Sequence, residues 1–457
     1  MSGVEHSMAK LFARAAALLR GEELDATRDH DAENLLQALE YAAVEPARGG
    51  NAVGPETANQ AHLLMAASRF ARVFELGAPD APGLISFGGQ FDPALADPMH
   101  QGSPMVGVSG VGLTLQEAFQ GCIGEGVEYL SQLQTETDLL FKPGIDDWAG
   151  KLGPMAIELA ADLSQRRTRP EGGLSWHRAT RLADGREVLL PADICVRRPP
   201  AQREFTPPFP LSIGSAAGPS REVAALHGLL ELIERDAASL WWRGGQFGRS
   251  IPPGHQAGVV AENLLRQLRR GVSPRRRTWL LDITTDIGIP SVAAISCRAD
   301  GSAFAFGLAA RPRLEAAVRS AIVEMCQGEL ADAVVAAKRS ERGDGALNAQ
   351  DRTHLRRAMV NADQCALLHP HPEHATHVSI DATEAGVIFE LIVKRLEKLG
   401  IETFCIDLTR RGFSVPVVRV IAPGLQLEPS EIVTARLTDI IARTGGGASY
   451  TGGIALI

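Results

Sequence analysis

Three separate stretches of this 457-residue chain carry one pattern at the same spacing. Each has its key positions at offsets 0, +2, +5, +9 and +12, and each ends in two oxygen-bearing side chains. The members are Gln116, Ala118, Gly121, Glu125 and Glu128; Glu222, Ala224, His227, Glu231 and Glu234; and Glu315, Ala317, Ser320, Glu324 and Gln327. Positions three apart on a helix share a face, so each stretch directs two oxygen ligands to one side. The matching offsets indicate one pseudo-symmetric site.

The residues around these pairs predict helices that are substantially buried. In the second stretch the two glutamates are flanked by Leu229, Leu230, Leu232 and Ile233. A single Glu-x-x-Glu pair is more typical of a solvated helix face, but charged side chains in apolar surroundings are rarely left without partners. Five carboxylates and one amide together suit Mg²⁺, which takes oxygen ligands and the phosphates of a substrate. The pattern therefore indicates a nucleotide-dependent enzyme.

Five segments, in order along the chain, resemble the motifs of the YcaO family. Residues 212–236, SIGSAAGPSREVAALHGLLELIERD, resemble the signature helix of that family. Residues 110–131 and 319–327 resemble its first and third ATP-site motifs, and residues 281–294 and 407–425 also match. The resemblance implies an α/β fold, a YcaO-like domain of pseudo-repeated α/β units around a nucleotide pocket, preceded by a helical N-terminal region.

The same resemblance implies that ATP and Mg²⁺ bind between the acidic helices and that the enzyme activates a backbone amide of a peptide. A nucleophile adds to the amide carbonyl, the resulting oxyanion takes the γ-phosphoryl group of ATP, and loss of phosphate removes the original oxygen. A Cys, Ser or Thr side chain as nucleophile gives an azoline, and external sulfide gives a thioamide. Magnesium neutralises the phosphates during in-line transfer. The sequence does not single out the general acid or base.

Metal and phosphate roles follow for the residues of the three stretches. The predicted Mg²⁺ ligands, direct or through water, are Glu125, Glu128, Glu231, Glu234 and Glu324. Gln327 is predicted to be a neutral ligand or to bond a phosphate oxygen. Arg235 and Arg319 are candidates for charge-assisted phosphate contacts. Ser212 begins a run of small residues where the backbone can approach a nucleotide closely.

The chain departs from the family pattern at positions that bear on phosphate binding and on the product. The departures within the motifs are Val111, Gly121, Tyr129, Pro219 and His227. Many azoline-forming members end in an alternating proline tail whose carboxylate reaches the active site, whereas this chain ends GGGASYTGGIALI. Either Ile457 reaches the site by another path, or the chemistry is not azoline formation. Thioamide formation, which accompanies a TfuA partner in this family, gains weight.

The pattern of the first hundred residues differs from that of the rest. Residues 1–100 are predicted to be a helical region that packs on the catalytic domain, forms a dimer contact or binds peptide, with helices at 5–20, 32–43 and 57–76 and a Gly/Pro-rich bridge at 77–105. Residues 101–430 are predicted to form the YcaO-like ATP-binding catalytic domain, with strands at 187–190, 278–283, 291–295, 404–407 and 415–421. Residues 431–457 are predicted to form a C-terminal helix and a Gly-rich tail.

Composition and cysteine spacing disfavour several other classes of protein. A net charge of −8 argues against a broad nucleic-acid-binding surface. The chain has no unbroken apolar run of membrane-spanning length and no signal-peptide core, which predicts a cytoplasmic protein with no membrane partner. The six cysteines form no C-x-x-C pair, which argues against a zinc ribbon or a disulfide framework. Cys122 and Cys326 are predicted to be buried small hydrophobes.

Two further clusters have both a functional and a solvated-surface interpretation. The segment HPHPEHATH could bind a metal or form a solvated loop, and it contains His369, His371, His374 and His377. The densest basic cluster could bind an acidic leader peptide or partner protein, or form a solvated face, and it contains Arg266, Arg269, Arg270, Arg275, Arg276 and Arg277.

The predicted function is ATP- and Mg²⁺-dependent activation of peptide backbone amides in the maturation of a ribosomally made peptide. A precursor peptide is the expected substrate, and a separate leader-binding or TfuA-like protein is the expected partner. The alternatives are an accessory role in modifying a ribosomal protein and a catalytically silent peptide-binding scaffold. The retained acidic residues disfavour the scaffold. The helical first hundred residues also suggest a homodimer.

Overall fold

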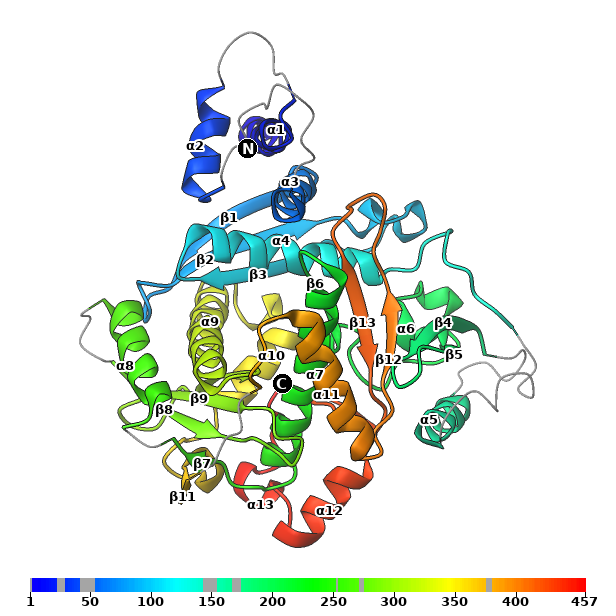
Figure 1. Ribbon diagram of the computed structural model, residues 1–457. Helices are drawn as coiled ribbons and strands as arrows, with labels where there is room; N and C mark the ends of the chain where they lie inside the picture. Colours follow the sequence, from blue (N-terminus) through cyan, green and yellow to red (C-terminus); the bar gives the residue numbers. More distant parts are fainter. Residues whose placement is uncertain are drawn as a thin grey trace.

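The computed structural model describes residues 2–22, 29–41, 54–142, 154–166, 174–251, 254–270, 275–374 and 380–457. Within them the strands form three sheets (Figure 1). The first is antiparallel and consists of β1 (Arg72–Gly77), β2 (Ile85–Phe91) and β3 (Val106–Gly112). The second has the order β10 (Ala305–Ala310), β9 (Ser291–Arg298), β8 (Arg276–Asp282), β7 (Arg249–Ser250) and β11 (His371–His374). The third has the order β5 (Glu187–Pro191), β4 (Trp176–Arg181), β12 (Phe404–Asp407), β13 (Val417–Ile421) and β6 (Ser215–Ala217).

One strand of each sheet leads directly into one of the three motif helices. These helices are α4 (Leu115–Gln132) after β3, α7 (Arg221–Trp242) after β6 and α9 (Leu314–Arg342) after β10. The side chain of Thr114 accepts a hydrogen bond from the backbone nitrogen of Glu117 at the start of α4, and Ser220 does the same for Val223 at the start of α7. The predicted helices of the three stretches are therefore confirmed, and Figure 1 shows them converging between the sheets.

Glycines allow two of these helices to lie very close to the strands that precede them. A Cβ built at Gly110 in β3 would lie 2.0 Å from the backbone nitrogen of Cys122, which is on α4. A Cβ built at Gly307 in β10 would lie 2.2 Å from the carbonyl oxygen of Ala321, which is on α9. Any larger residue would push the helix away. Glycine therefore sets how near the acidic side chains of these helices come to the strands.

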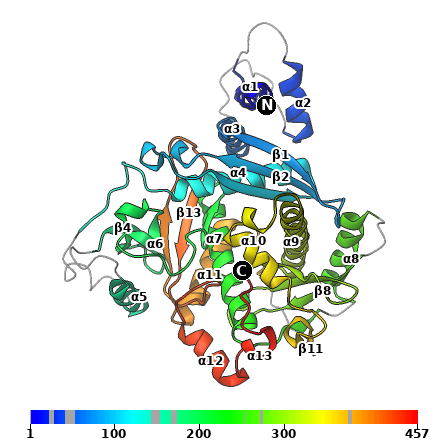
Figure 2. The ribbon, with the colours of Figure 1, turned by 180° about the vertical axis from the view of Figure 1, so that it is seen from behind.

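The remaining helices cover the motif helices and the sheets. The helix α8 packs on α9, α10 packs on α9, and α11 packs on α7. Their bounds and those of the other short helices are α5 (Pro154–Gln165), α6 (Ala192–Cys195), α8 (Gln256–Arg269), α10 (Ala349–Arg357), α11 (Ala385–Lys398), α12 (Ala435–Thr444) and α13 (Ala448–Thr451). Seen from behind, α10 lies between α7 and α9 near the C-terminal end of the chain (Figure 2).

The N-terminal helices are α1 (Ser2–Leu19), α2 (His30–Ala38) and α3 (Pro55–Ala67). They stand over the first sheet in Figure 1, and the ring of Phe12 in α1 lies 5.6 Å from that of Phe119 in α4. Helix α1 therefore contacts α4, and the predicted roles of this region, whether packing, a dimer contact or peptide binding, stay predictions. Part of the second predicted helix, residues 42 and 43, lies outside the described residues.

Two expectations for the first hundred residues were wrong. The helix predicted at 57–76 ends at Ala67, and residues 72–77 form strand β1 instead. The predicted bridge at 77–105 contains strand β2 and two short 3₁₀ turns. The reason is tertiary pairing, because Arg72–Gly77 align residue by residue with Ile85–Gln90, and β2 in turn pairs with β3. A domain boundary at residue 100 would therefore divide a sheet.

Most predicted elements of the catalytic region agree with the structure. The five predicted strands correspond to β5, β8, β9, β12 and β13, and the proline-rich segment 196–210 is a loop with one 3₁₀ turn. The six cysteines form no disulfide, and Cys122 and Cys326 are buried, as predicted. Among the described residues, no helix is long and apolar enough to cross a membrane.

Candidate active site

An open cavity of about 510 Å³ lies where the three motif helices meet. Glu125 of α4, Arg235 of α7, and Glu324 and Gln327 of α9 all line it. The full lining is Ser109, Glu125, Arg235, Phe306, Glu324, Gln327, Gly328, Ala331, Gln350, Thr353, His354, Arg357 and Ile457. We call this space the acid-lined cavity. Four of the predicted site residues, from motifs up to 202 positions apart, are thus brought to one place.

The first carboxylate of each motif makes the same hydrogen bond. Oε2 of Glu125 accepts from the backbone nitrogen of Ser109 at 3.2 Å. Oε2 of Glu231 accepts from Gly214 at 3.1 Å, and Oε2 of Glu324 accepts from Leu308 at 3.1 Å. Each donor belongs to the strand before the helix or to the turn entering that strand. The repeated spacing in the sequence therefore corresponds to a repeated geometry, in which a backbone N–H orients one oxygen of each carboxylate.

The second oxygen-bearing residue of each motif has a different partner. Glu128 accepts a hydrogen bond from Nε2 of Gln132 at 3.0 Å. Glu234 is buried and lies 3.7 Å from a guanidinium nitrogen of Arg235. Gln327 donates from Nε2 to Oγ of Ser109 at 3.0 Å, so α9 is tied to the first motif through an amide–hydroxyl contact. The donation leaves the amide oxygen of Gln327 available as a ligand.

The acidic side chains disfavour each other's ionisation. Burial raises the pKa of Glu324 to about 8, and repulsion from Glu234 adds to the rise. Burial raises the pKa of Glu125 to about 7, and Glu231 adds to it, although water screens part of the effect because Glu125 is open to the cavity. Burial also raises the pKa of Glu128 well above its ordinary value. The site therefore holds more potential negative charge than the protein neutralises.

Arg235 is the cation at the centre of this cluster. It lies 3.4 Å from Glu231 and 3.7 Å from Glu234. Burial opposes its charge, but Glu234, Glu231 and Glu324 together raise its pKa above the ordinary arginine value. Even together with Arg197 and Arg419, which also act on this cluster, Arg235 does not balance five carboxylates, so a bound cation would lower the repulsion among them.

The donor set fits magnesium if a ligand supplies further oxygens. Within the described parts of the chain, no three histidine, cysteine, aspartate or glutamate side chains lie close enough together to hold a metal on their own. Magnesium commonly keeps waters and shares its coordination between one or two carboxylates and substrate phosphates. The arrangement of separate carboxylates around an open cavity suits that mode of binding better than a closed protein cage.

Two arginines that the motifs did not predict, the half-buried Arg197 and the buried Arg419, flank the acidic cluster. Arg197, from the proline-rich loop, donates from Nε to Oε1 of Gln132 at 2.7 Å and lies 4.7 Å over the ring of Tyr129. Arg419 of β13 is 1% exposed, and its charge acts on Glu231 and Glu128. Burial lowers the pKa of Arg419 to about 10. Arg419 lies within the fifth motif segment, whereas nothing in the sequence around Arg197 indicated a role.

Two of the predicted phosphate-binding residues lie away from the acid-lined cavity. Arg319 does not line it and instead pairs with Oε1 of Glu117 at 2.6 Å, joining α9 to α4. Ser212 does not line it either, and its carbonyl oxygen accepts from the backbone nitrogen of Ser215 in a turn before β6. Their contacts to a nucleotide remain predictions.

The last residue of the chain, Ile457, does line the cavity. The segment before it is fixed by Nε1 of Trp242, which donates to the carbonyl oxygen of Ile454 at 2.7 Å. Nη1 of Arg357 donates to the carbonyl oxygen of Leu456 at 3.1 Å. Of the two alternatives for this tail, the structure therefore agrees with the one in which Ile457 reaches the site by a path without prolines.

The histidine-rich segment has a packing role where the structure describes it. The ring of His369 stacks on Trp279 at 5.6 Å, and its Nε2 lies 2.9 Å from the carbonyl oxygen of Ala362. His371 is exposed. The side chain of His374 and all of His377 lie outside what the structure describes.

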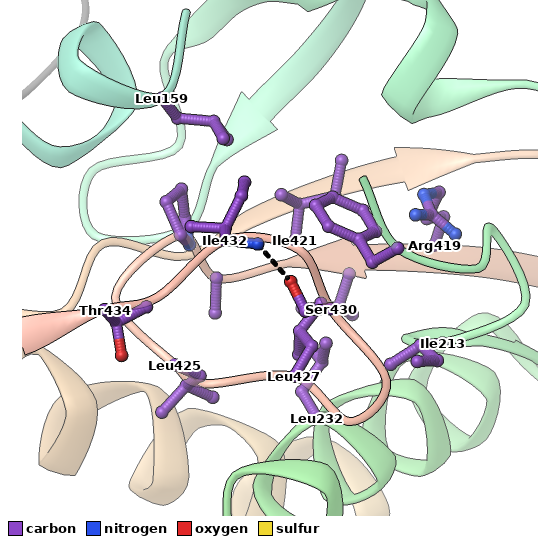
Figure 3. Close-up of a pocket in the computed structure, with 14 residues that line it drawn as sticks. Leu159, Ile213, Leu232, Arg419, Ile421, Leu425, Leu427, Ser430, Ile432 and Thr434 are labelled. Carbon is purple, nitrogen blue, oxygen red and sulfur yellow. Dashed lines mark hydrogen bonds between the residues drawn. The ribbon is translucent and has the colours of Figure 1, made fainter. Parts of the chain in front are cut away.

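A second, much smaller cavity beside α7 has a different character. Its volume is about 30 Å³, and its lining is mostly apolar, with Leu232, Ile421 and Leu427 among its residues. Figure 3 shows Arg419 at one end and the hydrogen bond from the backbone nitrogen of Ile432 to Oγ of Ser430. A space of this size holds about one water molecule, so it is a packing defect rather than a nucleotide site.

Comparison with known families gives a match over residues 109–426, to the family described as YcaO cyclodehydratase, ATP- and Mg²⁺-binding. A protein of Rhizobium leguminosarum bv. trifolii, described as an uncharacterized protein in the tfuA 3′ region, is 28% identical over 276 residues, which are 56% of this chain and 62% of that protein.

Two solved structures share the fold. One is a heterocyclase in complex with substrate and cofactor, with a TM-score of 0.64, 21% identity and coverage of 82% of this chain and 53% of that one. The other is YcaO from Methanopyrus kandleri bound with AMPPCP and Mg²⁺, with a TM-score of 0.54, 21% identity and coverage of 78% and 86%. The chain spans about half the length of the heterocyclase and less than two thirds of the tfuA-region protein.

Proposed function

This chain belongs to the YcaO family, and from that premise we propose that it uses ATP and Mg²⁺ to activate backbone amides of a peptide, giving thioamides or azolines. The predicted family, fold class and cofactors agree with the family match. The observation that carries the proposal is the acid-lined cavity, where Glu125, Glu324, Gln327 and Arg235 meet. This cavity is large enough for the phosphates of a nucleotide and an adjoining peptide segment.

The residues of the site have distinct roles in this proposal. Bound Mg²⁺ neutralises the phosphates of ATP and so favours attack on the γ-phosphorus. Glu125, Glu128, Glu231, Glu234 and Glu324 would hold the ion directly or through water. The backbone N–H bonds to Glu125 and Glu324 leave the other oxygen of each of these carboxylates free to face the ligand, whereas Oε1 of Glu231 also accepts from Arg235 at 3.4 Å. Gln327 would add a neutral oxygen where phosphates already bring negative charge. Arg235 would reduce the electrostatic repulsion among the carboxylates.

The same bonds form and break in the activation step for both products. The nucleophile bonds to the amide carbon, and the carbonyl oxygen bonds to the γ-phosphorus while the bond to ADP breaks. The phosphorylated oxygen then leaves as phosphate. With sulfide as nucleophile, the added sulfur loses its proton as phosphate leaves and becomes double-bonded to carbon. With a neighbouring side chain as nucleophile, its bond to the amide carbon closes the ring and it loses its proton; the amide nitrogen then loses its own proton as phosphate leaves, and a C=N bond forms.

We favour the thioamide. The support is the similarity to a protein from a tfuA region. A separate partner protein of the TfuA kind would then present the peptide or deliver sulfur. The azoline remains the second candidate, because Ile457 lies in the cavity wall, where an azoline-forming member would place its tail.

Mass spectrometry of a candidate precursor peptide tests the proposal. The peptide encoded beside the gene is incubated with the protein, ATP, Mg²⁺ and sulfide, with and without any TfuA-like protein encoded there. A sulfide-dependent gain equal to the mass difference between sulfur and oxygen identifies a thioamide synthetase. Loss of one water per site, without need of sulfide, identifies an azoline-forming enzyme. An unmodified peptide together with ATP binding would favour the role on a ribosomal protein or the silent scaffold.

A further inference from the structure

Helix α10 supplies a part of the cavity wall that carries no carboxylate. It follows α9 after a short turn, and its N-terminus is fixed by a capping box between Asn348 and Asp351. Gln350, Thr353, His354 and Arg357 line the acid-lined cavity from this helix. All four bear hydrogen-bond donors. The cavity therefore has an acidic side made by the motif helices and a donor side made by α10.

Arg357 is held firmly within the donor side. It is 6% exposed, its guanidinium lies 4.8 Å over the ring of Phe306, and Nη1 donates to the carbonyl oxygen of Leu456. Nη2 lies 2.7 Å from Nδ1 of His354. Its Nε is buried and has no hydrogen-bond partner among the described residues. A buried donor of this kind is costly unless a ligand or water satisfies it.

The contact with Arg357 determines which nitrogen of His354 carries the hydrogen. A guanidinium group only donates, so Nδ1 must accept, and the neutral ring then carries its hydrogen on Nε2. Oδ1 of Asp332 lies 3.5 Å from the same Nδ1 and would favour the opposite tautomer, but this distance is long, whereas the contact to Arg357 is short. His354 thus presents an N–H donor at Nε2, in a side chain that lines the cavity.

The two sides of the cavity match the charge distribution of a metal-bound triphosphate. A cation held by the carboxylates binds the phosphate oxygens on its own side, and the remaining oxygens still need donors. Arg235 already pairs with Glu231 at 3.4 Å and with Glu234 at 3.7 Å, although its buried Nε has no hydrogen-bond partner among the described residues. In the described lining, the other cationic side chain is Arg357 and the one imidazole is that of His354.

We propose that His354 and Arg357 of α10 bind the γ-phosphoryl group of ATP from the side opposite the acidic helices. The proposal rests on the proposed function, because it takes the acid-lined cavity to be the site of Mg²⁺ and ATP. Nε2 of His354 contacts a γ-phosphate oxygen, and Arg357 supplies positive charge and holds the ring in the donor tautomer. ADP lacks the γ-phosphoryl group and does not reach α10.

The test compares the affinities of two nucleotides, each with Mg²⁺, by isothermal titration calorimetry. In His354→Leu the affinity for the non-hydrolysable analogue AMPPCP falls by about tenfold, the loss of one charge-assisted hydrogen bond, while the affinity for ADP changes by less than about twofold. His354→Gln, which keeps an N–H donor, restores most of the AMPPCP affinity. Arg357→Lys keeps the charge but loses the fork geometry, and its affinity for AMPPCP lies between those of His354→Leu and His354→Gln. The matched control is Arg356→Gln, which removes an exposed arginine of the same helix and leaves both affinities unchanged.

Two results would overturn the proposal. One is an equal loss of AMPPCP and ADP affinity in His354→Leu, which would mean that α10 only supports the shape of the site. The other is an unchanged preference for AMPPCP over ADP in both His354→Leu and Arg357→Lys. Failure of the proposed function looks different, because the unsubstituted protein would then bind neither nucleotide in the presence of Mg²⁺.

Discussion

Helix α9 carries ionisable side chains on two faces, and the two groups are partnered very differently. On one face, Glu329 is 4% exposed and accepts from both guanidinium nitrogens of Arg269, at 2.6 and 2.8 Å. It also lies 3.0 Å from Nε of Arg276 and accepts from Oγ of Ser296 at 2.6 Å. On the other face, Glu324 has one backbone hydrogen bond and lies among other carboxylates.

The difference distinguishes a structural ion cluster from a ligand site. Glu329 pairs with Arg269 and Arg276, and Asp80 lies 3.7 Å from Arg276, so two carboxylates balance two guanidinium groups within the protein and that group needs no ligand. The acidic cluster keeps an excess of negative charge beside an open cavity, and it is stable only with protons or a bound cation. The basic cluster noted in the sequence is thus in part a buried structural network rather than a solvated face. The exposed members are Arg266, Arg270, Arg275 and Arg277, and the last of these pairs with Asp363.

The largest effect is expected from breaking the neutral cluster. Glu329→Gln leaves two buried guanidinium groups without their carboxylate, and the free energy of unfolding should fall by about 3 to 5 kcal/mol. Denaturant unfolding measures it. Glu187→Gln, which breaks an exposed pair with Arg178, is the control and should cost less than about 1 kcal/mol. A similar small loss in Glu329→Gln would remove the distinction between the two faces.

The next effect concerns catalysis rather than stability. Glu231→Gln removes a charge that the proposed function assigns to magnesium, and ATP turnover should fall by at least about 100-fold. Thermal unfolding should show no loss of stability, since burial disfavours the charge of Glu231 more than Arg235 stabilises it. The assay is phosphate release with Mg²⁺ and the peptide substrate. Full turnover in this variant would contradict the assignment of the acidic cluster as the metal site.

A third substitution should raise the free energy of unfolding, whereas the first lowers it. Glu324 has its pKa raised from the ordinary 4.5 to about 8, so between these values the folded protein binds a proton that the unfolded chain has released. Stability therefore falls as pH rises through this window. Glu324→Gln avoids that loss and should be more stable than the unsubstituted protein by about 2 kcal/mol at pH 9, and by much less at pH 5.

Unfolding without nucleotide at these two pH values provides the measurement for Glu324→Gln. Glu341→Gln, an exposed substitution near the end of the same helix, should show no pH-dependent difference. If Glu324→Gln were destabilising at pH 9, the carboxylate would be a structural partner like Glu329.

The smallest effect is expected at Arg319. Its guanidinium is 43% exposed and pairs with Glu117, so Arg319→Gln should change stability by less than about 1 kcal/mol. Nucleotide affinity should stay within about twofold if this ion pair is its whole role. A drop of about tenfold in affinity for Mg²⁺ and AMPPCP would restore the predicted phosphate contact and extend the ligand site beyond the acid-lined cavity.

The repeated motifs predicted the centre of the site because helical periodicity is local. Glu125, Glu231 and Glu324 each follow their strand by nearly the same number of residues, which is why the same backbone bond recurs. Residues outside the repeats gave no such signal. Arg197 comes from a proline-rich loop and His354 from a short polar helix, and both reach the site only because their segments pack against the motif helices.

The errors in the first hundred residues have a related cause. The local pattern predicts a helix through residues 68–76, but the strand β1 forms there through pairing with β2. Strand formation depends on a partner strand, and a partner is not visible in the local pattern.

The sequence by itself determined the three acidic helices, the common spacing of their oxygen-bearing side chains and the family to which the chain belongs. These follow from spacing and from short-range hydrogen bonding, which a chain carries in its own order of residues. Only the tertiary structure decided which charges remain unpaired. Glu329 and Glu324 are five residues apart on one helix, yet one is neutralised by Arg269 and Arg276 while the other faces a cavity. That outcome depends on which distant side chains pack against each face, and spacing along the chain does not specify them.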